Sequence, residues 1–305
     1  MTLKLHESIQ VEGIYSFKAV NSLTNEERDL SAFIADDHPN LFLNSGLEAL
    51  GTASDLAFGC RVGSGSSAVV ATQTALDSTV ASTTTVQSSS AGAQSSPPYF
   101  NWGRRTYRFA QGVATGNLTE VGVYSNISGN PLISRALILD SSGNPTTLTI
   151  LADEYLDVTY ELRCYVDTAD KNLELVLLGE TYNVVARPSN ITYSSAWADY
   201  FFTYMTHYWT TTSTFYNGPI GAITGTPSGS GANLNFTRMT YISGSHEQGL
   251  IHSAGLDFAN LSGGVSALRL RTSKGEWQLG FTPPIPKDNF KTLVINVYLS
   301  WARQP

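Results

Sequence analysis

The middle of the chain shows a repeating pattern of short apolar runs. Between residues 102 and 165, β-branched and aromatic runs alternate with clusters of Gly, Asn, Asp, Pro and Ser, at spacings of roughly ten to fifteen residues. A half-buried strand requires a period of two. The segment 157–165 has this period, with one face made of Val158, Tyr160, Leu162 and Cys164. We therefore predict consecutive antiparallel strands here, with a turn at residues 140–145.

Similar patterns predict further strands before this region. Residues 9–20 alternate well enough to form a strand, with Gly13 as a bulge or bend. Residues 29–35 are predicted to pair with it as a hairpin. A strand is also expected after Phe58, ending in a glycine turn. The run of residues 66–101 has one charge, Asp77, and too little apolar mass for its own core, so we expect an extended edge or a long loop.

One short helix is predicted at residues 44–51. Asn44 or Ser45 would cap its start, and Gly51 would end it.

The last third of the chain continues the β pattern. Residues 172–188 predict a hairpin that Pro188 ends. Four or more further strands are predicted between residues 234 and 303, among them 234–241, 265–272, 276–282 and 291–301, with a proline-rich turn at 283–287 between the last two. We expect an all-β fold of tandem antiparallel β-sandwich-like domains, 1–188 and 189–305, with at most one or two short helices.

The segment 193–216 is the most aromatic part of the chain, and its pattern is ambiguous. Tyrosines repeat every four residues, as on a helix face, whereas the threonine run at 210–214 favours a strand. The aromatic side chains suit a core or an oligomer interface, or a platform that contacts a partner chain or a glycan. The candidates for such contact are Trp197, Tyr200, Tyr204, Tyr208 and Trp209.

The charge and the N-terminal sequence limit the kinds of partner and the cellular location that we expect. The net charge is −7 and only 14% of residues are charged, which argues against nucleic-acid binding. The N-terminus has no apolar signal-peptide core, and no apolar run approaches the ~20 residues of a membrane helix. We expect synthesis in the cytoplasm without a signal peptide and no membrane insertion.

Residues that could carry chemistry do not assemble into a recognisable motif. The glycine loop at 62–67 lacks the Lys and the following helix of a phosphate loop. The histidines at 246 and 252 lack a third ligand at metal spacing, so we expect a surface loop there. The acidic pairs 36–37 and 153–154 point to opposite faces of a strand. We expect no catalytic residues, cofactor or metal.

Two remaining groups have structural interpretations. Cys60 and Cys164 could pair in principle, but the position of Cys164 on an apolar face predicts a buried thiol. Arg104, Arg105 and Arg108 are expected to pair with acidic neighbours or with a symmetry mate.

Seven segments of the sequence are distinctive when taken as a set. They are Leu43–Gly51, Cys60–Gly65, Trp102–Gly112, Gly116–Val123, Ser134–Pro145, Ala152–Arg163 and Phe281–Lys287. Together they resemble a family of tailed-bacteriophage virion proteins of the tail fibre or tail-tip type. The resemblance covers most of the chain, most densely residues 40–190.

The resemblance implies a non-enzymatic structural protein of the virion tail, in a fibre or baseplate, that contributes to host attachment. Its partners would be other copies of itself, as in a trimer, other phage tail proteins, and a host surface glycan or pilus. It carries over no functional residues.

Two alternatives remain open from the sequence. One is a head decoration or neck fibre protein. The other is a small carbohydrate-active depolymerase on a β-scaffold, for which two carboxylates, or a Tyr and an Arg, must converge in a groove. The candidates for that role are Asp153, Glu154, Glu247 and Asp257.

Overall fold

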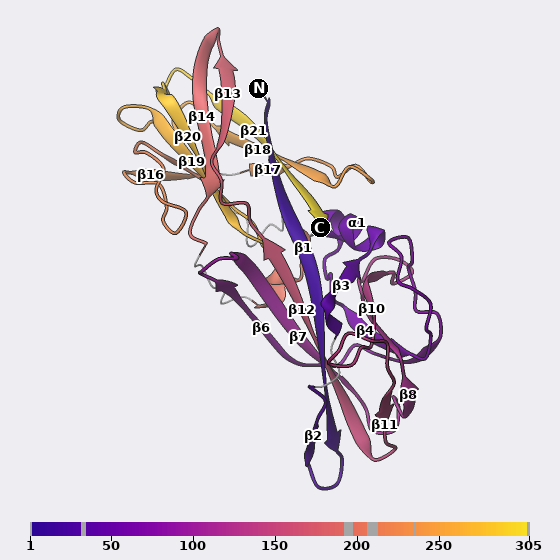
Figure 1. Cartoon of the computed structure of the whole chain (residues 1–305). Helices are drawn as coiled ribbons and strands as arrows, with labels where there is room; N and C mark the ends of the chain where they lie inside the picture. The colour runs from indigo at the N-terminus through magenta and orange to yellow at the C-terminus, as the bar shows by residue number, and fades with distance from the viewer. Residues whose placement is uncertain (1, 32–34, 192–197, 206–212, 235, 304–305) are drawn as a thin grey trace.

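In a computed structural model, the described part of the protein consists of many strands and two short helices (Figure 1). The structure describes residues 2–31, 35–191, 198–205, 213–234 and 236–303. The predicted all-β class is confirmed. The helices are α1 (Asn44–Thr52) and α2 (Ala198–Phe201). The strands are β1 (Thr2–Asn21), β2 (Glu27–Asp29), β3 (Ala35–Phe42), β4 (Gly59–Gly63), β5 (Thr79–Thr83), β6 (Val86–Gln94), β7 (Phe100–Phe109), β8 (Gly116–Leu118), β9 (Glu120–Tyr124), β10 (Leu132–Leu137), β11 (Leu148–Ile150), β12 (Glu154–Tyr165), β13 (Lys171–Leu177), β14 (Glu180–Pro188), β15 (Ser213–Tyr216), β16 (Gly231–Leu234), β17 (Phe236–Arg238), β18 (Glu247–Ala254), β19 (Val265–Arg271), β20 (Glu276–Ile285) and β21 (Leu293–Arg303).

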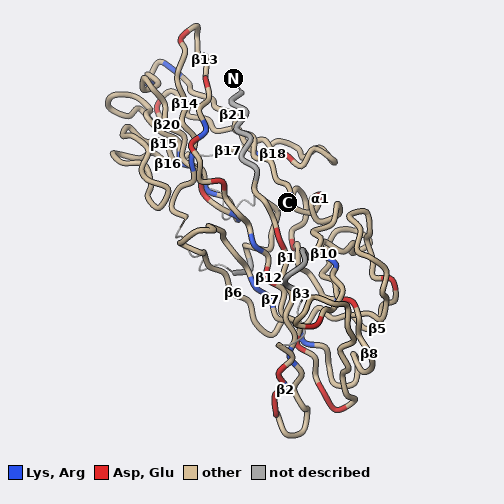
Figure 2. The backbone as a smooth tube through the Cα atoms, in the orientation of Figure 1, with Lys and Arg blue, Asp and Glu red and all other residues tan. Residues whose placement is uncertain are grey.

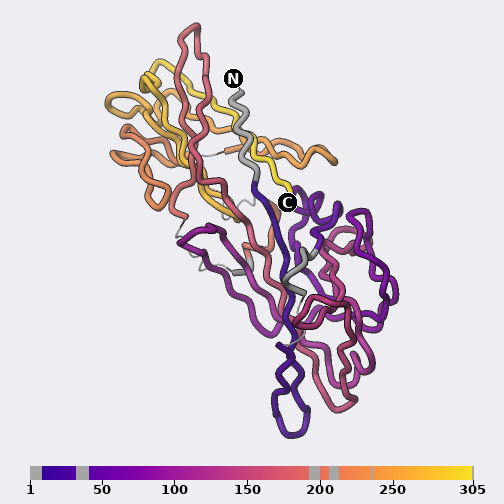
Figure 3. Tube along the Cα trace, viewed as in Figure 1, coloured from indigo at the N-terminus to yellow at the C-terminus, as the bar shows by residue number. Residues whose placement is uncertain are grey.

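The long strand β1 connects the parts of the largest sheet. Along one edge it pairs antiparallel with β12, from Gln10 to Asn21. Its other edge is shared by three strands in turn: β21, which is parallel to it, then β3, then β2. Figure 3 shows the C-terminal strand, in yellow, ending close to where the indigo trace begins. Strands that are far apart in the sequence therefore pair with the same strand, β1.

Two large sheets make up most of the molecule. The first has 13 strands and includes β6, β7 and β12 on one side of β1, and β3, β10, β9, β4 and β5 on the other. The second has six strands in the order β13-β14-β20-β19-β15-β16. Strands β8 and β11 form a small separate pair.

The predicted domain division falls at residue 188, the last residue of β14. Strands from both sides of this position share each large sheet, since β21 pairs with β1 and β20 pairs with β14. One continuous cluster of buried apolar side chains likewise draws on both sides of residue 188. Shared sheets, as well as the chain itself, thus join the two segments.

The alternation predicted for residues 157–165 is present in β12. Val158, Tyr160, Leu162 and Cys164 are completely buried. The opposite face carries the ion-paired side chains described below. The predicted turn at 140–145 is also present, and Gly143 takes the positive φ that the turn requires. The hairpin of β13 and β14 is confirmed, including its end at Pro188.

The irregularity predicted at Gly13 is present on one edge of β1 only. The register between β1 and β12 runs unbroken through Gly13, and the register shift lies on the other edge, toward β3, between Gly13 and Tyr15. A Cβ atom at residue 13 would lie 2.7 Å from the phenol of Tyr160. Glycine is needed here for the close approach of that buried ring.

The helix at 44–52 exists, but its predicted capping is wrong. Asn44, Ser45 and Gly51 lie inside α1; the N-cap is Leu43, without a side-chain cap, and the C-cap is Ala53. Backbone contacts with other elements position the start instead, because Leu43 N–H donates to Ile133 O and Asn44 N–H to Ala71 O, both at 2.8 Å. Tertiary hydrogen bonds thus replace the local cap.

The predicted turn at 283–287 is also wrong, because β20 continues through Pro283 and Pro284 to Ile285. The pairing with β14 ends at Thr282, and the register with β19 shifts between Val265 and Ala267. Neither ladder therefore requires a backbone N–H from the two prolines, which allows them in the strand.

Candidate functional site

The described part of the aromatic segment is largely interior. Phe201, Phe202 and Met205 are buried. Its backbone is bound to the chain around the end of α1: Tyr204 N–H donates to Ala53 O at 2.9 Å, and Met205 N–H to Leu50 O at 2.7 Å. Both predicted secondary structures occur, since the segment contains α2 and β15.

The five predicted contact residues divide into two groups. Tyr200 and Tyr204 are half-buried, and the guanidinium of Arg238 lies 4.3 Å from the ring centre of Tyr204. Trp197, Tyr208 and Trp209 lie outside the described residues. A partner or glycan contact by this set stays a prediction.

Two of the candidate catalytic carboxylates are already engaged within the fold. Arg28 donates to both carboxylate oxygens of Glu154, from Nε at 2.8 Å and Nη2 at 2.6 Å. These hydrogen bonds lower the pKa of Glu154. Asp153 accepts a hydrogen bond from Asn21 at 2.8 Å. The side chains of the other acidic pair, Asp36 and Asp37, lie outside the described part of the structure.

The remaining candidates are too far away to complete a catalytic pair. Glu154 is opposite Asn21 on β1, whereas Glu247 is opposite Ser300, whose neighbour on β1 is Ser8. Thirteen residues of extended strand separate Ser8 from Asn21, which is about 40 Å. Glu247 is the first residue of β18 and Asp257 follows the other end of this strand, which is about 20 Å long. The two carboxylates of a glycosidase lie within about 10 Å of each other.

The arginine cluster pairs with acidic neighbours. Arg104 contacts Glu161, and Arg108 donates to both oxygens of Asp157 at 2.7 Å. Arg105 points to the other face of β7 and reaches Asp55 at 2.6 Å. Figure 2 shows basic and acidic residues interleaved along β7 and β12. These charges therefore compensate one another on neighbouring strands.

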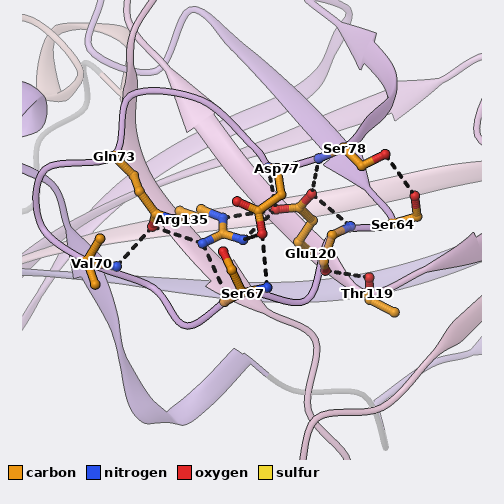
Figure 4. A network of polar contacts seen from close by, with 10 residues as sticks. Ser64, Ser67, Val70, Gln73, Asp77, Ser78, Thr119, Glu120 and Arg135 are labelled. Atoms are coloured by element: carbon orange, nitrogen blue, oxygen red, sulfur yellow. Dashed lines mark hydrogen bonds and ion pairs between the residues drawn. The ribbon is translucent and has the colours of Figure 1, made fainter.

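The glycine loop at 62–67 does hold an anion, but one that the chain itself supplies. Figure 4 shows the buried carboxylate of Glu120 within this loop. It accepts hydrogen bonds from the backbone N–H groups of Gly65 and Ser78 at 2.9 Å and of Asp77 at 3.1 Å. Backbone donors in a loop of this kind favour a negative charge.

Arg135 completes this arrangement, which we call the Arg135 network. Its side chain is completely buried and donates to Glu120 at 2.9 Å, to Asp77 at 2.8 Å and to Gln73 at 2.9 Å. It also reaches the carbonyl oxygen of Ser67 at 3.3 Å. The network fastens the long loop between β4 and β5 to strands β9 and β10. The sequence contained one sign of it: a charged residue inside each of two apolar runs, 118–123 and 133–139.

His252 corrects the prediction of a surface loop. It lies on β18, completely buried, and neither ring nitrogen has a hydrogen-bond partner among the described residues. Burial lowers its pKa to about 4. His246 does lie in a turn, with Nε2 at 3.1 Å from Glu48.

Lys274, which the sequence did not single out, is completely buried in the connection between β19 and β20. Its ammonium donates to the carbonyl oxygen of Thr203 at 2.6 Å and to Ser273 Oγ at 2.7 Å, and it lies 5.2 Å from the ring centre of Phe201. Its own carbonyl oxygen accepts a hydrogen bond from Asn101 at 2.9 Å. Burial lowers the pKa of Lys274 to about 7.

The two cysteines are free and buried, as predicted for Cys164. Burial raises the pKa of the Cys60 thiol, and it raises that of Cys164 to about 12. Both thiols are therefore protonated near neutral pH, which does not suit a nucleophile.

One pocket, of about 460 Å³, lies between the chain following α1 and the start of β6. We call it the β6 pocket. Its lining mixes an aromatic ring, hydroxyl and amide groups and one ion pair, and consists of Asp55, Phe58, Thr84, Val86, Gln87, Ser88, Ser89 and Arg105.

Comparisons with known proteins found no relative of this chain. The chain matched no protein-family model, no curated protein and no solved structure. Within the described residues there is no cluster of three or more acidic, His or Cys side chains that could hold a metal ion. No helix in the described ranges is long and apolar enough to cross a membrane.

Proposed function

We propose that this protein is a non-enzymatic structural component of a tailed-bacteriophage virion, of the tail fibre or baseplate type, that contributes to host attachment. The first support is the resemblance of seven sequence segments, named in the sequence analysis, to tail fibre and tail-tip proteins. The observation on the molecule that carries the proposal is the arrangement around β1, in which one long strand joins β2, β3, β12 and β21.

Such an arrangement suits a mechanical role. The body is elongated (Figure 1), and its strands are cross-connected through β1 and through ion pairs between neighbouring strands. Interior charges serve to fasten loops, as in the Arg135 network. The candidate carboxylates of the alternative depolymerase function are either bound to other side chains or separated by tens of ångströms, so the observations favour the structural role.

The test is the composition of the particle. Virions of the phage that encodes this chain are purified on a density gradient and digested for mass spectrometry. We expect peptides of the chain at several copies per particle, and immunogold labelling at the tail. Labelling at the head or neck would instead support a decoration protein, and absence from purified virions would refute the proposal.

A second measurement concerns self-association. Light scattering on the full-length recombinant protein reports its oligomeric mass. We expect a symmetric oligomer such as a trimer, which is common for fibre-like parts. A monomer at micromolar concentration would contradict self-association outside the particle.

A further inference from the structure

The β6 pocket differs from the other polar regions of this molecule because the uncharged polar side chains that line it make no hydrogen bonds within the described structure. The side chains of Thr84, Gln87 and Ser88 make no hydrogen bond to any described residue, and Ser89 Oγ is buried without a partner. Ser89 lies opposite Arg105 in the β6–β7 register, so both side chains are on the same face. A buried hydroxyl without a partner costs free energy unless a ligand or water satisfies it.

An aromatic ring lies beside these hydroxyls. Phe58 leaves 39% of its surface exposed, which is high for a phenylalanine flanked by buried residues. Its backbone N–H donates to Tyr124 O at 2.9 Å, and its ring meets that of Tyr124 edge-on, with centroids 6.1 Å apart. The ring is therefore held in place while part of it faces open space.

The third component is a compensated pair of charges. Arg105 Nη1 lies 2.6 Å from Asp55 and 2.8 Å from the carbonyl oxygen of Ala57. The pocket thus offers charged donors and acceptors but no net charge. This balance favours a neutral ligand rich in hydroxyl groups over an anion or a cation.

We infer that the β6 pocket is a binding site for a neutral sugar. A pyranose ring has an apolar C–H face and a rim of hydroxyls, which match the Phe58 ring and the hydroxyl, amide and ionic groups of the lining. The volume is at the lower end of the roughly 300–1,000 Å³ typical of ligand sites, which suits one or two sugar rings. The site is distinct from the aromatic segment 193–216, and the inference does not depend on the protein being part of a virion.

A peptide strand added to the edge of β6 is the main competing occupant, because within the described structure β6 pairs only with β7. The register of β6 shifts between Val86 and Ser88, at the mouth of the pocket. Such an irregularity twists a strand edge and hinders the addition of another strand. The geometry therefore favours the sugar.

The experiment is saturation-transfer-difference NMR on the full-length protein with the methyl glycosides of glucose, mannose, galactose and N-acetylglucosamine, and with N-acetylneuraminate as an acidic probe. We expect at least one neutral glycoside to give a saturable signal. Phe58→Ala should weaken its binding about tenfold, because the stacking surface is lost. Ser89→Ala should weaken it about threefold or more, through one hydrogen bond.

Matched controls come from the same chain. Phe290→Ala removes an exposed phenylalanine on the loop before β21, and Ser22→Ala removes another buried hydroxyl without a partner, far from β6. Both should leave sugar binding unchanged, and thermal unfolding should show that all four variants are folded. The inference is wrong if no neutral glycoside binds, if only the acidic probe binds, or if Phe58→Ala binds as well as the wild type.

Discussion

Two cations without solvent exposure, Arg135 and Lys274, are accommodated in opposite ways. Arg135 lies under the loop between β4 and β5 and contacts two carboxylates, an amide and a carbonyl oxygen. Lys274 lies in the connection between β19 and β20, and within the described residues its ammonium contacts neutral oxygens and the face of an aromatic ring but no carboxylate. The first charge is compensated; the second is not.

The difference follows from the chemistry of the two groups. A guanidinium does not lose its proton in proteins, so a buried arginine requires acidic partners. A lysine can become neutral when it is desolvated, and the lowered pKa of Lys274 reflects this. The same molecule therefore contains a buried cation that is permanently ion-paired and a buried cation that can lose its proton.

The largest expected effect is from removing the compensated charge. Arg135→Ala leaves the buried carboxylate of Glu120 without its cation, and we expect a loss of about 3–5 kcal/mol of unfolding free energy. Urea denaturation measures it. Lys18→Ala, which breaks an exposed pair with Glu27, should cost less than about 1 kcal/mol. Equal losses in the two variants would mean that the Arg135 network contributes no more than a surface ion pair.

Near neutral pH, Lys274→Met should raise the free energy of unfolding, whereas Arg135→Ala lowers it. The pKa of Lys274 is about 7 in the folded protein and near 10.5 when unfolded. The unfolded chain therefore binds the proton more readily, and the wild type loses stability as pH falls from 10.5 to 7. We expect the methionine variant to be more stable than the wild type by a few kcal/mol at pH 7, with the gap closing toward pH 10.5.

Urea denaturation at several pH values tests this. Tyr15, Tyr107, Cys60 and Cys164 have raised pKa values and titrate in the alkaline range, so the informative quantity is the difference between the two proteins. A difference that does not depend on pH between 7 and 10.5 would contradict the assignment of Lys274 as the titrating group.

His252 is a third buried base and extends the comparison. Its pKa is about 4 when folded and 6.5 in its ordinary range, so its contribution to stability is fully present above pH 6.5 and is lost as pH falls toward 4. His252→Leu also removes two buried nitrogens without partners. We expect a gain of about 1 kcal/mol at pH 7.5 and a larger one at pH 5. Thermal unfolding at the two pH values measures it, and a gain that shrinks at pH 5 would refute the argument.

The smallest expected effect is within the Arg135 network. Asp77 is partly exposed, and hydrogen bonding with Ser67 is the main cause of its lowered pKa. Asp77→Asn keeps most of the shape and leaves Glu120 to compensate Arg135. We expect a loss below about 1 kcal/mol in urea denaturation. A loss as large as that of Arg135→Ala would show that both carboxylates are equally needed.

Much of the strand pattern was predictable because it depends on local alternation. The faces of β12 and the hairpin of β13 and β14 follow from period-two apolar residues and turn residues. The capping of α1 was not predictable, because Leu43 and Asn44 are bound by carbonyl groups of distant segments. The strand β18 was missed because its histidine was interpreted as a surface residue.

The candidate sites were harder to predict for the same reason. The Arg135 network joins residues from four parts of the chain, and sequence alone cannot pair Glu120 with Gly65. The β6 pocket combines Phe58, which follows α1, with hydroxyls from a serine-rich run that has no motif. Both depend on which strands become neighbours.

The parallel pairing of β1 with β21 has a consequence for synthesis in the cell. Strand β1 leaves the ribosome long before its partner β21, and the paired residues run from Thr2 opposite Asn296 to Val11 opposite Arg303. At about 5–20 residues per second, roughly 15 to 60 s separate the translation of these two strands. During that interval one edge of β1 lacks its partner and can pair with other nascent chains. Recombinant yield should therefore depend on translation speed, growth temperature and the supply of chaperones.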